Sequence, residues 1–110
     1  MELAFENKVI RNICENEKAA IKEFGQLVAK KLRNRLADLM AAEVIEDVPK
    51  IGKPTSLQSD SKPSWKVSLR DGYYLFFSSN HLNTPILGNG KIDWHAINRI
   101  KIIKIIKTDE

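Results

Sequence analysis

The chain has 110 residues, of which 43% are hydrophobic and 29% are charged, and its formal net charge at pH 7 is +4; these values are typical of one small globular domain with a single core. Its apolar runs are far shorter than the roughly 18 residues that cross a bilayer, and the start MELAFENK lacks the basic residues and apolar stretch of a signal peptide, so we expect a cytoplasmic protein with no membrane partner. The single cysteine, Cys14, excludes an intrachain disulfide and a cysteine-cluster metal site.

The first two predicted elements are a strand and a short helix. In residues 2–6, Leu3 and Phe5 alternate with glutamates and an alanine, which is the period of a half-buried strand. Asn7 is a suitable N-cap for a helix over residues 8–16. Cys14 lies on the apolar face of this helix, so we interpret it as a buried structural thiol, with a catalytic nucleophile as the alternative.

A longer helix is predicted over residues 17–42. Apolar side chains recur there at steps of three and four residues; they are Phe24, Leu27, Val28, Leu32, Leu36, Leu39 and Met40. Gly25 marks either a close approach of another backbone or the point where this helix begins. The exposed face is basic, and it either contacts RNA phosphates or is a solvated surface that docks a partner.

Residues 48–64 contain three of the four prolines, which predicts a surface loop. A β-hairpin follows, because two strand-like runs flank Asp71-Gly72, a dipeptide suited to a type I′ turn. On its first strand Trp65 belongs to the buried face and Lys66 to the opposite one. The second strand, YYLFFSS, is apolar or aromatic on both faces, which suits a central strand covered by helices on one side and by a ligand or partner on the other.

The chain ends in a lysine repeat, IKIIKIIK, that fits neither a helix nor a strand period. Before it, residues 79–91 are a turn-rich connection and IDWHAIN is a single helical turn. Six isoleucines in residues 97–106 favour a strand, since β-branched side chains crowd a helix; a membrane-active cationic helix is the alternative. A regular strand would place Lys101 and Lys107 on one face, unless a bulge intervenes.

These elements follow the order strand, helix, helix, strand, strand, strand. Residues 1–110 are therefore expected to form one α+β domain, with a mostly antiparallel twisted sheet of about four strands and two N-terminal helices packed on one face.

Four segments in order, ELAFEN, FGQLVAKKLRNRLADLMAAE, WKVSLRDGYYLFF and IDWHAINRIKIIKII, resemble the HigB branch of the RelE/ParE superfamily of toxins. The resemblance implies a RelE-like fold and the toxin half of a type II toxin–antitoxin system. Such toxins enter the ribosomal decoding site and cleave messenger RNA there as metal-independent endoribonucleases without a cofactor. A cognate antitoxin, often with a helix-turn-helix DNA-binding domain, holds them inactive.

Metal-free RNA cleavage needs a base, an acid and a cation that stabilises the phosphorane. The resemblance implies a histidine in the loop before the hairpin and an arginine on its second strand, but Thr55 and Tyr74 occupy those positions. The Asp-Tyr-His-like end of the last strand is replaced by Lys107, Thr108 and Asp109. We therefore assign Tyr74, Asp109 and Lys107 as candidate catalytic residues, and Lys62, Lys66, Arg70, Lys30, Lys31 and Arg33 as candidates for binding RNA or phosphate.

Two alternatives to the ribonuclease are open at this point. One is a RelE-fold toxin that acts by binding its target without cleaving it, and the other is a non-toxic RNA-binding or regulatory protein. Tyr74 is also a candidate for stacking on a base. His81 and His95 are interpreted as solvated or hydrogen-bonded residues and not as catalytic bases.

Overall fold

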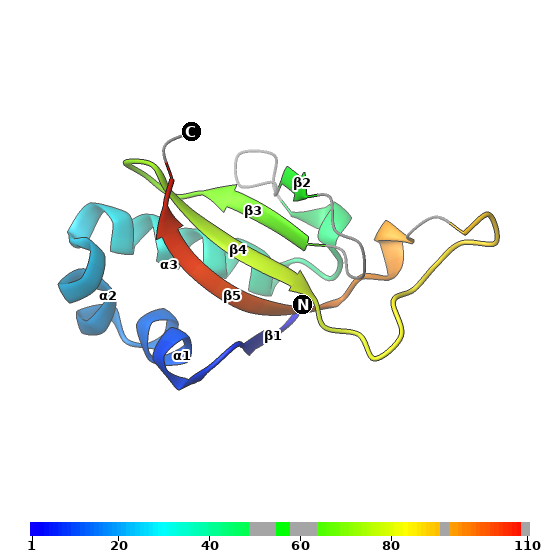
Figure 1. Ribbon diagram of the computed structural model, residues 1–110, viewed down its shortest axis with the longest axis horizontal. Helices are drawn as coiled ribbons and strands as arrows, with labels where there is room; N and C mark the ends of the chain where they lie inside the picture. Colours follow the sequence, from blue (N-terminus) through cyan, green and yellow to red (C-terminus); the bar gives the residue numbers. More distant parts are fainter. Residues whose placement is uncertain (49–54, 58–63, 91–92, 109–110) are drawn as a thin grey trace.

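A computed structural model of the chain describes residues 1–48, 55–57, 64–90 and 93–108, and it has an α+β architecture (Figure 1). In chain order, the elements are β1 (Glu2–Phe5), α1 (Lys8–Glu15), α2 (Glu17–Phe24), α3 (Gln26–Ala41), a 3₁₀ turn (Ile45–Asp47), β2 (Thr55–Leu57), β3 (Ser64–Ser68), β4 (Tyr73–Ser79), a second 3₁₀ turn (Trp94–Ala96) and β5 (Arg99–Lys107).

The sheet has five strands in the order β1-β5-β4-β3-β2. β1 runs parallel to β5, whereas the other three pairings are antiparallel, so the prediction of a mostly antiparallel sheet is confirmed. The predicted number of strands is too low, because β2 lies in the segment interpreted as a loop. Its three residues pair with β3, with Thr55 opposite Lys66, and a strand this short leaves little periodic signal in a sequence.

Three helices, not two, separate β1 from β2. Gly25 divides the long predicted helix: it has φ of +88°, its N–H donates to the Ile21 carbonyl at the end of α2, and α3 begins at the next residue. A Cβ at Gly25 would meet no atom within 4 Å, so the glycine is required by the left-handed backbone and not by a close approach. Side-chain caps begin the other two helices, since Asn7 accepts from the N–H of Ile10 and Asn16 from that of Ala19.

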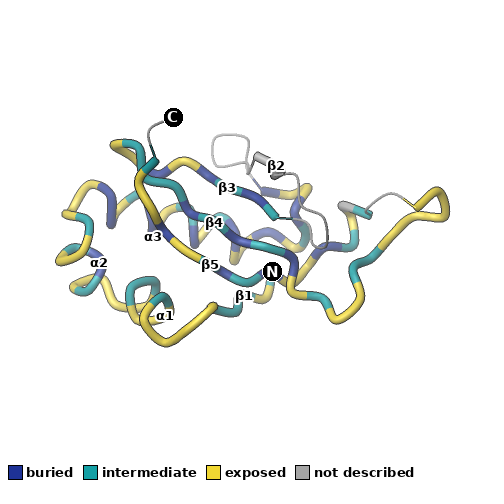
Figure 2. Tube along the Cα trace, viewed as in Figure 1, coloured by how far each residue is buried: buried dark blue, intermediate teal, exposed yellow. Residues whose placement is uncertain are grey.

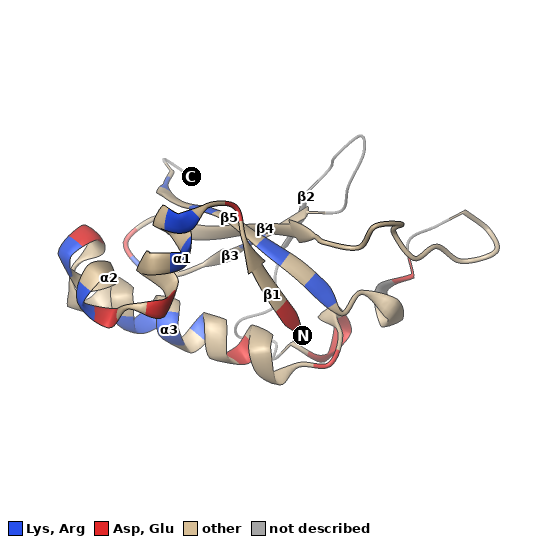
Figure 3. Cartoon of the chain, turned by 90° about the horizontal axis from the view of Figure 1, so that it is seen from below, with Lys and Arg blue, Asp and Glu red and all other residues tan. Residues whose placement is uncertain are grey.

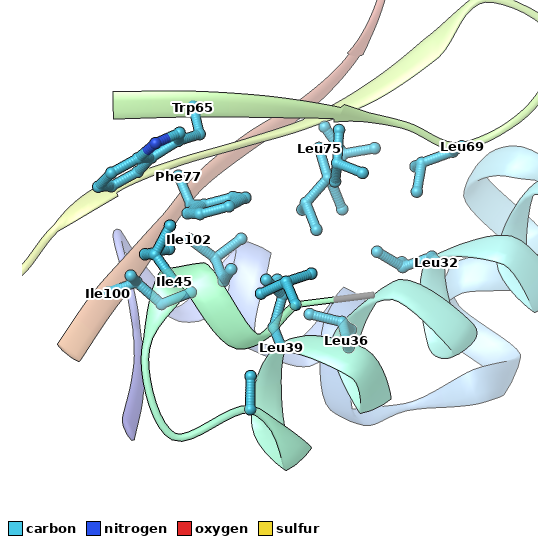
Figure 4. Packing of buried hydrophobic residues seen from close by; sticks show 14 of the residues in the cluster. Leu32, Leu36, Leu39, Ile45, Trp65, Leu69, Leu75, Phe77, Ile100 and Ile102 are labelled. Carbon is cyan, nitrogen blue, oxygen red and sulfur yellow. The ribbon is translucent and has the colours of Figure 1, made fainter. Parts of the chain in front are cut away.

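The core lies between α3 and one face of the sheet (Figure 4). Trp65 and Phe77 stack with ring centroids 5.6 Å apart, and these strand residues point toward the leucines of α3. Figure 2 shows that buried residues gather on the central strands and on α3, whereas α1, α2 and the loop after β4 are mostly half-buried or exposed. Leu27 and Met40 were predicted to lie on the apolar face of the helix, but they are 55% and 64% exposed. The prediction is wrong for these two residues.

A β-bulge in β5 explains how the lysine repeat fits a strand. Tyr73 to Phe76 pair with Lys107 to Lys104, but the next pair is Phe77 with Ile102, so Ile103 is one extra residue. As a result Ile102 and Ile105 are both buried although they are three positions apart. The bulge also means that Lys101 and Lys107 lie on opposite faces of the sheet and not on the same one.

The predicted hairpin turn is confirmed. Asp71 and Gly72 both have positive φ, at 55° and 83°, as a type I′ turn requires. The register also depends on Arg70, which is one extra residue on the β3 side of the turn: the N–H of Tyr73 donates to the Arg70 carbonyl, and the N–H of Leu69 donates to the Tyr73 carbonyl. Ser68 therefore lies opposite Tyr74 and Trp65 opposite Phe77, and this register decides which side chains share a face of the sheet.

Candidate nucleic-acid interface

The face of the sheet that points away from α3 carries aromatic and basic side chains. Residues that lie directly opposite each other on neighbouring strands share a face, so Phe76 has Lys66 on one side and Lys104 on the other. In the next row, Tyr74 lies between Ser68 and Ile106. Figure 1 looks onto this face, and none of the helices in the described ranges crosses it.

Two lysine ammonium groups lie over the aromatic rings of this face. Lys66 Nζ is 4.7 Å from the centroid of the Tyr74 ring, and Lys104 Nζ is 4.9 Å from that of Phe76. The two rings are 6.4 Å apart with an interplanar angle of 55°. Each cation–π contact contributes about 0.5–1 kcal/mol at an exposed site. We call these four side chains, Lys66, Tyr74, Phe76 and Lys104, the outer-face platform.

The structure separates two of the three candidate catalytic residues, Tyr74 and Lys107. Tyr74 and Lys66 are neighbours on the outer-face platform, but Lys107 belongs to the other face of the sheet. It lies opposite Tyr73, with its Nζ 5.9 Å from that ring, and Tyr73 packs edge-on against Phe24 at 5.2 Å. The remaining candidates, Asp109 and Lys62, lie outside the described residues.

The basic residues of α3 lie on the other side of the sheet. Lys30 and Arg33 are exposed on the helix that covers the inner face, and Lys31 is half-buried. Arg33 Nη1 is 3.1 Å from Glu17 Oε1, and Figure 3 shows basic and acidic residues interspersed along α2 and α3. Arg70 is exposed at the hairpin turn, with its Nε 3.9 Å from Asp71 Oδ1. These residues therefore do not extend the outer-face platform.

Two members of the platform were missed as site residues when only the sequence was considered. Phe76 had a usable signal, because the second hairpin strand is aromatic on both faces and one of them had to lie away from the core. Lys104 had none, since without the bulge at Ile103 a regular alternation would place it on the same face as Ile102.

Cys14 lies in an apolar groove of about 540 Å³ between β1, α1 and α3. Leu3, Phe5 and Met40 are among the side chains that line it. Burial, and to a smaller extent the neighbouring Glu15 carboxylate, raises the pKa of the Cys14 thiol to about 12. The thiol is protonated at neutral pH, which favours the structural interpretation of Cys14 over a nucleophile.

The histidines have structural surroundings. His81 Nε2 accepts a hydrogen bond from the N–H of Asn98 at 3.2 Å, which ties the loop after β4 to the segment before β5. His95 is exposed, and its backbone N–H donates to the Asp93 carboxylate. Neither lies on the outer-face platform.

The described part of the chain contains neither a metal centre nor a membrane-crossing helix. No three side chains among its His, Cys, Asp and Glu residues are arranged so that they could hold a metal ion. None of its helices combines the length and the apolar character needed to cross a membrane.

Comparison with known proteins adds no relative: no family profile, no curated protein and no solved structure matches this chain.

Proposed function

We propose that this protein is the toxin of a type II toxin–antitoxin system and that it inhibits translation by binding messenger RNA in the ribosome. The observation that supports this proposal best is the outer-face platform. Stacking on an aromatic side chain is worth about 1–3 kcal/mol per base, and lysines supply the phosphate contacts that carry most affinity for RNA. Tyr74 and Phe76 provide the rings, and Lys66 and Lys104 provide the charges beside them.

The partners in this proposal come from the resemblance to HigB-like toxins. They are the ribosome with its messenger RNA, and a cognate antitoxin with a helix-turn-helix domain, all in the cytoplasm. A RelE-like fold is compatible with the order of the elements along the chain. This order is a strand, a helical segment, a hairpin and a last strand. A gene for a helix-turn-helix protein directly beside the gene for this chain would support the partnership.

Ribosome-dependent cleavage of the messenger RNA is the second candidate function. It is favoured by the position of Tyr74 on the outer face of the sheet, where Lys66 Nζ lies 4.7 Å from the centroid of the Tyr74 ring. In such a reaction the 2′-oxygen attacks the adjacent phosphorus and the 5′-oxygen leaves, which gives a 2′,3′-cyclic phosphate. Tyr74 would protonate the leaving oxygen, Asp109 would take the 2′-OH proton, and Lys66 would stabilise the phosphorane.

Controlled expression in bacteria tests both functions at once. We expect growth arrest with the native chain and loss of arrest with Tyr74→Ala, because that variant removes the ring. Tyr74→Phe is the matched control: it keeps the ring but removes the hydroxyl. If the protein acts by binding, Tyr74→Phe still arrests growth.

Mapping the 5′ ends of cellular messenger RNA separates cleavage from binding. New ends inside translated frames that fall about 10²–10⁴-fold in Tyr74→Phe would assign proton transfer to Tyr74. Growth arrest without new ends would exclude the ribonuclease and leave the binding toxin. Normal growth with normal translation would contradict the toxin proposal itself.

A further inference from the structure

We infer that the outer-face platform binds two consecutive, unstacked nucleotides of single-stranded RNA, with one base on Tyr74 and the next on Phe76. Lys66 and Lys104 would move from the rings to the flanking phosphates. This inference rests on the proposed function and specifies the form of RNA that the same face accepts.

The ring geometry selects single strands. Tyr74 and Phe76 are two positions apart on β4, and their centroids are 6.4 Å apart. Stacked bases in a strand follow each other at about 3.4 Å, so two bases that each lie on one ring are about twice as far apart as in a stack. The rings are also inclined by 55° to each other. A single strand can splay its bases in this way, whereas a duplex keeps them stacked and paired.

The lysines give the platform two states. Without RNA, each ammonium lies within 5 Å of a ring centroid, at 4.7 Å for Lys66 and 4.9 Å for Lys104, so a lysine occupies part of each ring. A base that takes over the ring makes a stronger contact than the cation does. The displaced ammonium, on its flexible four-carbon stem, can then pair with a phosphate. When RNA binds, each ring therefore exchanges its lysine for a base, and each lysine exchanges its ring for a phosphate.

The same contacts predict tolerance of base sequence. Stacking uses the face of a base, and lysine contacts the phosphate, so neither reads the hydrogen-bonding edge that distinguishes one base from another. We expect oligonucleotides of different sequence but equal length to bind with similar affinity.

Fluorescence anisotropy with labelled RNA measures this binding directly. The probes are a single-stranded hexauridine, a mixed-sequence hexanucleotide and a hairpin whose stem is fully paired. Phe76→Leu and Tyr74→Leu keep an apolar side chain but remove the ring, and each should weaken binding of both hexanucleotides by about 5- to 150-fold. Lys18→Gln is the control, because Lys18 is an exposed lysine on α2 and its loss should leave the affinity unchanged.

A tryptophan placed on the platform reports stacking itself. In Phe76→Trp the new indole should bind RNA at least as tightly as phenylalanine, and its fluorescence should be quenched when a base stacks on it. Circular dichroism and thermal unfolding would establish that every variant is folded before its affinity is interpreted.

Three results would overturn the inference. The first is unchanged affinity in both ring variants while Lys66→Gln and Lys104→Gln weaken binding, which would mean purely electrostatic binding and would leave the proposed function intact. The second is binding of the paired hairpin as tightly as the hexanucleotides. The third is no binding of RNA by the native chain, which would remove the proposed RNA target as well.

Discussion

Phe76 and Phe77 are adjacent residues of β4 with opposite environments. Phe77 is fully buried between the sheet and α3 and stacks with Trp65, whereas Phe76 is half-buried on the outer face beneath Lys104. The alternation of side chains along a strand is the cause of this difference. The first phenylalanine is therefore available to a ligand, and the second contributes to stability.

Alanine at each position should separate these roles. Phe77→Ala leaves a cavity in the core and should lower the free energy of unfolding by about 3–5 kcal/mol. Phe76→Ala removes a half-buried ring and should cost only about 1 kcal/mol. Urea denaturation followed by circular dichroism measures both values, and equal losses would contradict the assignment of the two faces.

At the scale of the element, β5 shows what could be predicted from the sequence and what could not. Its isoleucines predicted a strand correctly, because β-branched side chains favour the extended backbone. The broken alternation of IKIIKIIK is compatible with a bulge, but pairing with β4 fixes the bulge at Ile103, so the faces of the individual lysines could not be assigned from the sequence. The hairpin turn was predictable from Asp71-Gly72, while the three residues of β2 carried too short a pattern.

The candidate site was predictable to a similar extent. Tyr74 was identified because it stands where the resemblance to HigB-like toxins implies an arginine, and Lys66 because it lies on the face of the hairpin opposite Trp65; the structure places the two side chains together. The separation of Lys107 from Tyr74 depends on strand pairing across the sheet, which local periodicity does not contain. The basic face of α3 was identified from composition, but composition does not tell which side of the sheet a helix covers.

Deletion of Ile103 tests the role of the bulge. Without this residue, Ile102, Lys104 and Ile105 alternate regularly and keep the faces that they now have, so the change in unfolding free energy should be about 1 kcal/mol or less. Deletion of Leu75 from β4, which has no bulged residue, is the matched control. It should unfold the protein, because a shift by one residue moves side chains to the opposite face. Unfolding of both variants would show that the bulge itself is required.

At the scale of the whole molecule, two groups of candidate RNA-binding lysines and arginines belong to separate surfaces. Lys66 and Lys104 lie on the outer face of the sheet, and Lys30 and Arg33 lie on the helix that covers its other face. A short RNA cannot contact both surfaces at once, because the sheet lies between them. Net charge alone therefore does not identify the surface that binds.

The salt dependence of RNA binding distinguishes these surfaces. Each phosphate contact of a single strand contributes about 0.7 to the slope of log K against log salt concentration. Lys104→Gln should therefore reduce the slope by about that amount, and Lys30→Gln should leave it unchanged. The measurement is a titration of the labelled hexanucleotide at several salt concentrations. The opposite pattern would assign RNA binding to α3.

The short strand β1 has a consequence for the behaviour of the protein at high concentration. β5 contains five isoleucines in nine residues, and such a segment readily pairs with copies of itself when its edge is free. β1 covers that edge from Arg99 to Ile102. Fraying of these four residues would expose the backbone of an isoleucine-rich strand to neighbouring molecules, so resistance of the folded protein to aggregation depends on how firmly residues 2–5 are held.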